Sequence, residues 1–155
     1  MTEQERNILL VDLCARLPYG VKIDREWVAP MTGSPEHSIH EFDTFDIEIL
    51  TSWLDEEGGG LVTCDDGRLH WVRKYSCKPY LRSILSITKE ERRELLHFGG
   101  LSISESEEIL DVSCVGFERH CKVQDWLNAH HFDYRGLIEK GLALEAPEGM
   151  YEIKN

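Results

Sequence analysis

The stretch from Asp125 to Ile153, DWLNAHHFDYRGLIEKGLALEAPEGMYEI, marks the boundaries of its own secondary structure. A helix is expected over residues 122–131, because apolar or half-apolar side chains recur there at the spacing of one helical face. These side chains are Val123, Trp126, Leu127 and His130. Asp133 then suits the cap of a second helix, with its carboxylate accepting the backbone N–H of Arg135 or Gly136.

The same stretch is predicted to end in a β-hairpin. Gly141 suits the left-handed conformation in which helices often end, and Leu142 supplies the apolar contact of such a stop. The turn-forming residues 146–149 then separate two short edge strands, Leu142–Glu145 and Met150–Ile153. The C-terminal part is therefore predicted as helix, helix and hairpin.

The N-terminal residues 3–15 predict an amphipathic helix. Thr2 can cap it together with Glu5, three positions further on, and Pro18 ends it. A short strand, Tyr19–Ile23, is expected to follow.

A β-rich region is expected between Phe42 and Lys74, after a surface loop over residues 29–37 that holds two prolines and a glycine. FDTFDIEIL, which begins at Phe42, alternates apolar side chains with acids, as a half-buried strand does. LVTC and RLHWVRK flank Asp65-Asp66-Gly67, whose Asp-Gly step is typical of a hairpin. These strands predict a small antiparallel sheet covered on one face by the N-terminal helix.

The second half of the chain is predicted to be more helical. KPYLRSILSI, residues 78–87, is interpreted as an extended connector because it contains Pro79. Thr88 caps a helix, KEERRELLHF, that stops at Gly99-Gly100. A turn at Ser102–Glu108 and a strand from Ile109 to Phe117 follow. The prediction is one α+β domain over residues 1–155, with two lobes, 1–76 and 77–155, as the alternative division.

Composition narrows the class of protein. The 155 residues are 41% hydrophobic and 30% charged, which is an ordinary globular composition. No apolar run approaches the roughly 20 residues that cross a bilayer, and the N-terminus lacks the cationic region of a signal peptide, so no membrane association is expected. The five cysteines form no CxxC pair, which favours reduced thiols, no disulfides and a bacterial-type cytoplasmic location.

Charge is segregated along the chain, whose formal net charge is −12. Residues 36–66 hold ten acids and no Lys or Arg, whereas residues 68–93 hold eight Lys or Arg and two acids. A net-negative molecule repels nucleic acid over about 8 Å at physiological salt. Sequence-independent nucleic-acid binding is therefore disfavoured for the molecule as a whole.

The basic segment contains a candidate interaction strip in which cations alternate with aromatic rings. Its members are Arg68, Trp71, Arg73, Lys74, Tyr75, Lys78, Tyr80 and Arg82. Cations with stackable rings suit an acidic peptide or single-stranded nucleic acid. The alternative is that the rings are core and the bases pair with acidic strands, particularly at Asp43, Asp46 and Glu48. Tyr134 and Arg135, just after the predicted cap, are added as further interaction candidates.

Catalytic, metal and phosphate sites are weaker interpretations. His130, His131 and Asp133, or Cys114, His120 and Cys121, lack the spaced pairs of zinc sites. Cys114 could be combined with His97 or His120 and with Asp111, but no nucleophile turn accompanies them. Gly58-Gly59-Gly60 follows acids and is not followed by Lys-Ser/Thr, so it is not a phosphate loop. No catalytic residue, metal or cofactor is therefore expected.

Three blocks of the sequence resemble a known family. They are DLCARLPYGVKI near the start, KPYL in the middle and DWLNAHHFDYRGLIEKGLALEA near the end. Together they are similar to a family of small uncharacterised proteins common in intestinal Bacteroidales and their mobile elements. The family pattern has a proline-bearing version of the connector where this chain reads RSILSIT. The resemblance implies no activity.

The favoured hypothesis is a non-enzymatic, cytoplasmic interaction module, whose acidic sheet face or basic-aromatic strip meets a protein partner. The segregated charge supports this hypothesis. Two alternatives stay open. One is a nucleic-acid-associated regulator or a nucleic-acid mimic, and the other is a small hydrolase that depends on Cys and His.

Overall fold

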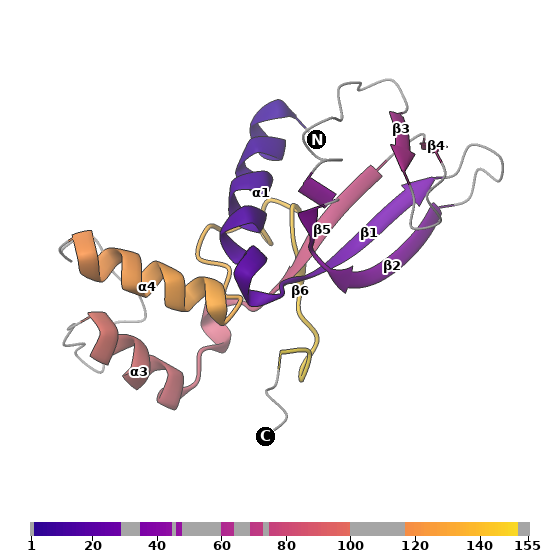
Figure 1. Cartoon of the computed structure of the whole chain (residues 1–155). Coiled ribbons are helices and arrows are strands. Elements are labelled where there is room, and N and C mark those ends of the chain that lie inside the picture. Colours follow the sequence, from indigo (N-terminus) through magenta and orange to yellow (C-terminus); the bar gives the residue numbers. More distant parts are fainter. Residues whose placement is uncertain are drawn as a thin grey trace.

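The chain has an α+β fold in the computed structural model, as the sequence predicts. The structure describes residues 2–28, 35–44, 46–47, 60–63, 69–72, 75–99 and 117–151. Its elements, in chain order, are α1 (Glu3–Arg16), η1 (Leu17–Tyr19), β1 (Lys22–Val28), β2 (Pro35–Glu41), β3 (Gly60–Thr63), β4 (Leu69–Val72), β5 (Tyr75–Leu81), η2 (Ile84–Ser86), α3 (Lys89–Gly99), α4 (Phe117–Ala129) and β6 (Leu144–Glu145). Helix α1 lies against a four-stranded sheet, and α3 and α4 lie side by side next to this assembly (Figure 1).

Helix α1 begins and ends as expected. Thr2 Oγ1 accepts the backbone N–H of Glu5 at 3.2 Å, and the Glu5 carboxylate accepts the N–H of Thr2 at 2.7 Å. This reciprocal capping box satisfies two of the four N–H groups that a helix start leaves open. Pro18 lies in the short 3-10 helix that follows, and Gly20 then turns the chain at φ +65°.

The main sheet has the strand order β2-β1-β5-β6. Strand β1 pairs antiparallel with β2 on one side and with β5 on the other, whereas β6 pairs parallel with β5. The predicted hairpin of residues 61–64 and 68–74 forms as an antiparallel pair, β3 with β4. The turn between them, including the Asp-Gly step, lies outside the described residues, as do the predicted elements over residues 102–116.

The main sheet uses other segments than the sequence predicted. The strand expected at Tyr19–Ile23 begins three residues later and extends to Val28, because Gly20 closes the turn after η1. The loop expected over residues 29–37 already becomes β2 at Pro35. A proline is tolerated there because it occupies the first residue of a strand.

The strand predicted from Phe42 is wrong at the described positions. Thr44, Asp46 and Ile47 are helical. Asp43 Oδ1 accepts the N–H of Asp46 at 3.1 Å, and Asp46 Oδ2 accepts the N–H of Asp43 at 3.2 Å. This reciprocal acidic cap favours a helical turn over the strand that alternation suggested.

The predicted connector after Cys77 is instead the strand β5, which has neighbours on both sides. Pro79 is compatible with this position because it forms the last pair of the β1–β5 ladder, opposite Ile23. Its missing N–H therefore falls where the ladder ends. Thr88 and Glu91 then cap α3 reciprocally, as predicted for the start of this helix.

The C-terminal prediction is half correct. Helix α4 contains the predicted helix 122–131 except for its last two residues, and it begins earlier, at Phe117. The expected second helix is wrong, because residues 134–141 form successive turns. Asp133 does accept backbone N–H groups, but from Leu137 and Ile138, both at 2.8 Å. These two bonds close a turn without starting a helix.

The expected hairpin is also wrong in its described part. Leu144–Glu145 pairs with β5, at Tyr80 and Leu81, and Met150 and Tyr151 lie in turns. Gly141 does adopt the predicted left-handed conformation, at φ +70°, and Leu142 is buried. The segment after Gly141 therefore completes the main sheet and forms no separate hairpin.

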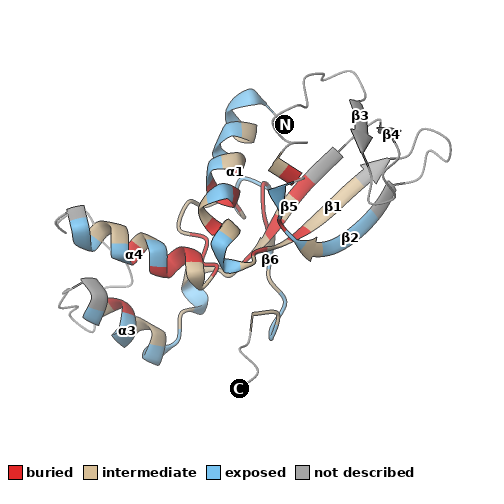
Figure 2. Ribbon diagram, in the orientation of Figure 1, coloured by how far each residue is buried: buried red, intermediate tan, exposed pale blue. Residues whose placement is uncertain are grey.

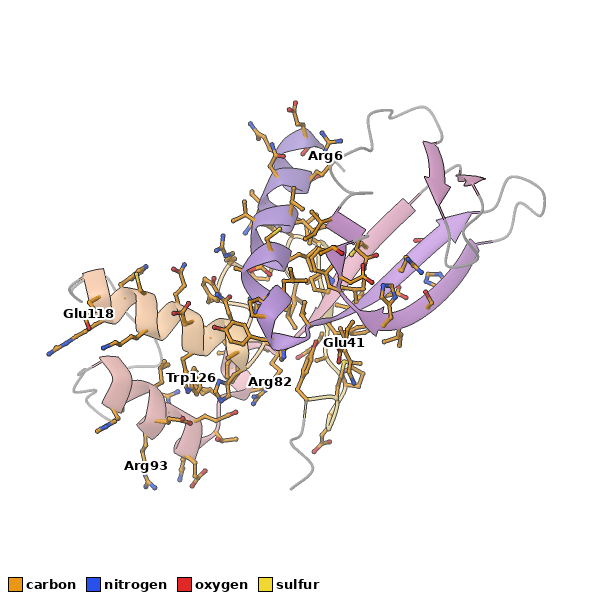
Figure 3. All side chains as sticks on the ribbon, viewed as in Figure 1. Arg6, Glu41, Arg82, Arg93, Glu118 and Trp126 are labelled. Carbon is orange, nitrogen blue, oxygen red and sulfur yellow. The ribbon has the colours of Figure 1, made fainter. Side chains whose placement is uncertain are left out.

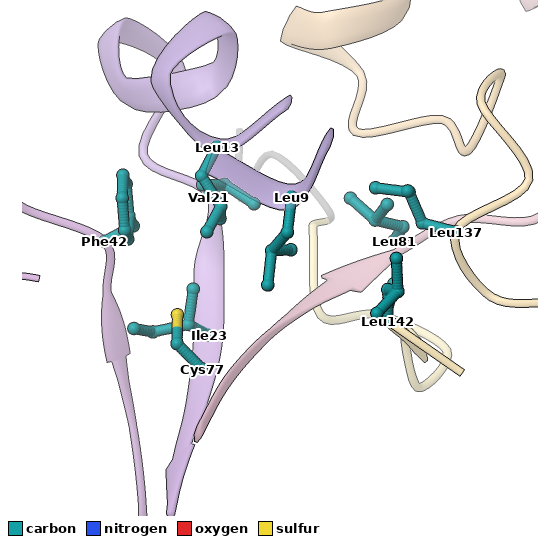
Figure 4. Packing of buried hydrophobic residues seen from close by; sticks show 10 residues of the cluster. Leu9, Leu13, Val21, Ile23, Phe42, Cys77, Leu81, Leu137 and Leu142 are labelled. Atoms are coloured by element: carbon teal, nitrogen blue, oxygen red, sulfur yellow. The ribbon is translucent and has the colours of Figure 1, made fainter. Parts of the chain in front are cut away.

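Two clusters of buried hydrophobic side chains stabilise the fold. The first lies between α1 and the sheet and contains Leu9, Leu13, Val21, Ile23, Phe42, Cys77, Leu81, Leu137, Leu142 and Ala143 (Figure 4). The second joins α3 and α4 through Leu95, Val123, Trp126, Leu127 and Phe132. Full burial of one such large side chain contributes about 1.5–3 kcal/mol. Because residues 137–143 belong to the first cluster, the clusters do not divide the chain at residue 77.

No helix among the described residues is both long enough and apolar enough to span a bilayer.

Candidate functional site

The sheet has one face toward α1 and one face toward solvent. Along β5, Cys77, Pro79 and Leu81 are buried, whereas Lys78 and Tyr80 between them are half-buried. Successive side chains of a strand point to opposite faces, so this alternation separates the two faces of the sheet. The buried Ile23 of β1 and Cys77 of β5 pack with Leu9 and Leu13 of α1, so the buried side chains lie on the α1 face (Figure 4). The opposite face is called the open face here.

The register of the strands identifies the members of the open face. Lys22, Asp24 and Glu26 of β1 lie opposite Glu41, Ile39 and His37 of β2, and Asp24 lies opposite Lys78 of β5. Each of these side chains is half-buried or exposed. With Tyr80, they make a solvent-facing patch in which acids and bases alternate across strands.

Asp24 is the electrostatic centre of the open face. Its Oδ2 lies 3.1 Å from His37 Nδ1, and Lys78 is its neighbour across the β1–β5 ladder. Burial, followed by the nearby Asp24 charge, raises the pKa of Tyr80. The phenol therefore stays protonated at neutral pH and can donate a hydrogen bond to a bound partner.

The predicted basic-aromatic strip does not form one described surface. Lys78 and Tyr80 share the open face, whereas Arg82, Tyr134 and Arg135 are half-buried and bond to other parts of the fold beyond the end of β5. Trp71 lies in β4 and Tyr75 in β5, but the structure does not describe their side chains. Arg68, Arg73 and Lys74 lie outside the described residues.

Arg82, which follows β5, contacts both α3 and the segment after α4. Its guanidinium donates two hydrogen bonds to the Glu91 carboxylate, at 2.7 and 3.0 Å, and lies 4.2 Å from the ring centroid of Phe132. Burial alone would raise the pKa of Glu91, but hydrogen bonds from Arg82 and Thr88 outweigh it and hold the pKa at about 2. Figure 3 shows Arg82 beside Trp126, where the strand meets the helix pair.

A second ion pair, which was not predicted from the sequence, is fully buried on α1. Arg16 Nε donates to Asp12 Oδ2 at 2.7 Å, and both side chains are inaccessible to solvent. Arg16 Nη2 donates to the carbonyl oxygen of Phe132 at 2.8 Å, and Arg135 Nε lies 3.2 Å from Asp12 Oδ1. The sequence contains a signal for this pair, because Asp12 and Arg16 share one helical face with Leu9 and Leu13.

Tyr134 completes this buried polar region. Its hydroxyl donates to Asn128 Oδ1 at 3.1 Å and accepts from Arg135 Nε at 3.2 Å. The guanidinium carbons of Arg16 and Arg135 lie 5.6 and 5.2 Å from the centroid of its ring. Tyr134 and Arg135, predicted as interaction residues, therefore hold α1 to the turn after α4.

The histidines considered as metal ligands have packing contacts. His130 stacks on Trp126 with ring centroids 3.9 Å apart, and its Nδ1 lies 2.9 Å from the Trp126 carbonyl oxygen. His131 is buried at φ +58° and stacks on Tyr151 at 3.9 Å. Burial, and then the charge of Arg16, lowers the pKa of His131 to about 4. In the described part of the chain, no three His, Cys, Asp or Glu side chains gather as a metal site would require.

Asp46 forms a second buried polar cluster near the sheet. Its carboxylate lies 3.0 Å from His40 Nε2 and 3.7 Å from Arg25 Nη1. Cys77 lies near this cluster in the core, and burial followed by the Asp46 charge raises the pKa of its thiol well above 9. A protonated thiol is a poor nucleophile, so the cluster has the character of a structural site.

The catalytic combination considered from the sequence, Cys114 with His97 or His120 and Asp111, lies only partly within the described residues. Cys114 and Asp111 lie outside the described residues, His97 is exposed on α3, and His120 is half-buried on α4.

A scan against protein-family models gives no match, and searches of curated proteins and of solved structures give none either.

Proposed function

We propose that this protein is a non-enzymatic, cytoplasmic interaction module that binds a protein partner on the open face of its sheet. One observation supports this proposal above the others. The open face presents Lys78, Asp24 and Tyr80 together, half-buried and directed away from the core. A partner could cover these side chains without disturbing either hydrophobic cluster.

The chemistry of the open face suits a protein surface. Tyrosine provides apolar area and a hydroxyl donor at little entropic cost, and interfaces are enriched in it. Acids and bases alternate across the strands, so a partner with the opposite pattern would pair with them and a uniformly charged one would not. A nucleic-acid backbone is uniformly negative and would meet Asp24, Glu26 and Glu41 together with a net charge of −12.

A role in binding is favoured over catalysis by the state of three reactive groups among the described residues. The thiol of Cys77 is buried and protonated, and His131 is buried and neutral at pH 7. The carboxylate of Asp133 accepts two backbone N–H groups and thereby fixes a turn. These contacts give each group a role in the fold.

Reversal of one charge on the open face tests the proposal. Lys78→Glu places an acid beside Asp24, so it should abolish affinity capture of the partner from the native cell. Lys122→Glu is the matched control, because Lys122 is an exposed lysine on α4. Arg82 is unsuitable for this test because its replacement would also break the contact with Glu91.

The expected result is loss of one co-purifying protein with Lys78→Glu and its retention with Lys122→Glu, with both variants folded by circular dichroism. Equal capture by the two variants would reject the open face as the binding surface. Salt-dependent binding of a single-stranded oligonucleotide below about 10 μM would instead favour the nucleic-acid-associated regulator.

A further inference from the structure

Strand β2 is the edge of the main sheet. All seven of its residues pair with β1 on one side, and no described strand pairs with the other side. An edge strand presents backbone N–H and C=O groups to any strand that can approach it. Figure 2 shows the described part of β2 largely exposed, and its Ile39 side chain is 59% exposed.

The sequence of β2 is self-complementary when it is reversed about Ile39. We propose that two copies of the chain associate through β2 in an antiparallel pair with Ile39 on the two-fold axis. In this pair, Ile39 faces Ile39 of the second copy. His37 faces Glu41 of the second copy, and the symmetry of the pair makes this contact twice.

The two contacts reinforce each other because they lie on one face. Residues directly opposite in an antiparallel pair have Cβ atoms about 4.5–5.5 Å apart and project to the same side. His37, Ile39 and Glu41 alternate along β2 and all are exposed. An apolar contact at the centre would therefore be flanked on each side by a polar contact between His37, whose Nδ1 lies 3.1 Å from Asp24 of its own copy, and Glu41 of the other copy.

Charge and the exposed Ile39 side chain together favour this register of the β2 pair. Each copy carries −12, so the two copies repel at long range, and a stable register must bring complementary or apolar side chains together. An axis at Ser38 would place Ile39 against His37 and leave the exposed isoleucine without an apolar neighbour. The axis at Ile39 covers this side chain and places the imidazole of His37 against each Glu41.

The expected association is weak. Pairing of one short edge strand buries less than the roughly 1,200 Å² of a standard stable interface, and the net charges of the two copies repel. A concentration-dependent equilibrium between monomer and dimer follows. This inference concerns the edge of β2 and does not rest on partner binding near Lys78.

Analytical ultracentrifugation across a range of concentrations tests the pairing. The wild type should show a reversible dimer. His37→Glu sets an acid against Glu41 of the second copy twice, so it should raise the dimer dissociation constant about tenfold or more. The double variant His37→Glu with Glu41→Lys restores opposite charges in both contacts and should recover the dimer.

Leu85→Asp is the control, because Leu85 is 84% exposed on the turn η2, away from β2. It should leave the dimer unchanged. A wild type that stays monomeric at every concentration, or a dimer that His37→Glu does not weaken, would overturn the proposal.

A cross-link decides the register even if His37→Glu impairs folding. Ile39→Cys places two thiols opposite each other on the axis, and mild oxidation should give a covalent dimer sensitive to reductant. This variant and the control Leu85→Cys both carry Cys14→Ser, because Cys14 is exposed and can itself form disulfides. Leu85→Cys and the Cys14→Ser parent should give no covalent dimer above background. Equal cross-linking by both cysteine variants would contradict the placement of the axis.

Discussion

At the scale of single residues, Glu91 has two structural roles. Its carboxylate caps α3 through the N–H of Thr88 at 2.9 Å and binds the guanidinium of Arg82 at the end of the sheet. The folded-state pKa of about 2 lies below the usual 4.5. Glu91 therefore stabilises the fold fully above about pH 4.5, and this stabilisation is lost as the pH falls toward 2.

Glu91→Gln is expected to lower the free energy of unfolding by roughly 2–3 kcal/mol at pH 7. The difference from wild type should shrink below about pH 4.5 and be small near pH 2. Urea titrations at several pH values measure it. His131, with a folded pKa of about 4, also costs the wild type stability below about pH 6.5, so the difference between the proteins is the relevant quantity.

Glu118→Gln is the matched control for this change. Glu118 also bonds to a cation, Lys122, but its side chain is 83% exposed to solvent. Solvent screens such a pair, so the substitution should change stability little at any pH. A constant difference between Glu91→Gln and wild type across the pH range would contradict the assigned role of Glu91.

Substitutions at Gly141 test the cost of backbone strain at a single residue. Its φ is +70°, and nothing lies within 4 Å of the position that a Cβ would occupy. Gly141→Val should therefore destabilise the fold by about 1–3 kcal/mol through conformation alone. Gly141→Asn should cost less, because asparagine adopts this conformation more readily. Thermal or urea unfolding compares the two, and equal losses would argue against conformational strain.

At the scale of elements, the sequence predicts the starts of α1 and α3 but neither the start of α4 nor the strand partners of the main sheet. The helix starts at Thr2 and Thr88 depend on side chains three residues away, so a short window of sequence contains the whole signal. Strand β5 depends on neighbours distant in the chain, and Pro79 within it suggests a connector. The acidic alternation after Phe42 likewise suggested a strand, whereas a local Asp43–Asp46 cap made a helical turn.

Helix α1 carries two buried charged side chains, Asp12 and Arg16. Asp12 accepts hydrogen bonds from Arg16 and forms an ion pair with Arg135, so one fully buried carboxylate compensates two guanidinium groups, of which that of Arg135 is partly exposed. A carboxylate in that position is more costly to remove than either base, since its loss leaves two cations without a counter-ion.

Asp12→Asn is therefore expected to cost about 3–5 kcal/mol of unfolding free energy. Arg135→Gln should cost about 1 kcal/mol, because Asp12 keeps its bond to Arg16 and the Arg135 side chain is partly exposed. Urea titration at pH 7 measures both variants. A larger loss for Arg135→Gln than for Asp12→Asn would reverse this explanation.

At the scale of the whole molecule, three segments that are far apart in the chain meet around Phe132. Asp12 and Arg16 come from α1, Arg82 follows β5, and Phe132 and Arg135 follow α4. This meeting accounts for the separation of Arg82 from Lys78 and Tyr80, because Arg82 binds within the fold.

This convergence was not predictable from the sequence. The sequence identified Lys78 and Tyr80 as interaction candidates, but their shared face depends on the register of β5 against β1. The role of Arg82 depends on Glu91 and Phe132, which only the three-dimensional path of the chain brings together. The α+β class required only local patterns.

A substitution at Phe132 tests whether the two hydrophobic clusters unfold as one unit. Its ring packs in the cluster of α3 and α4, while its carbonyl oxygen accepts from Arg16 of α1. Phe132→Ala should cost about 3–5 kcal/mol. Native-state hydrogen exchange should show the same loss for core amides of α1 and of α4, if they share one cooperative transition.

Leu85→Ala, on an exposed side chain, should leave both sets of amides unchanged. Loss of protection confined to α4 would indicate that the clusters unfold separately.

The parallel pairing of β6 with β5 has a consequence for the synthesis of the chain. Leu9, Leu13 and Leu81 leave the ribosome early, yet Leu137, Leu142 and Ala143 complete their cluster. Such long-range contacts form slowly, because a long loop must close before they are made. Until residues 137–143 have been synthesised, Leu9, Leu13 and Leu81 therefore lack part of their apolar cluster. Apolar surface left uncovered at this stage favours aggregation.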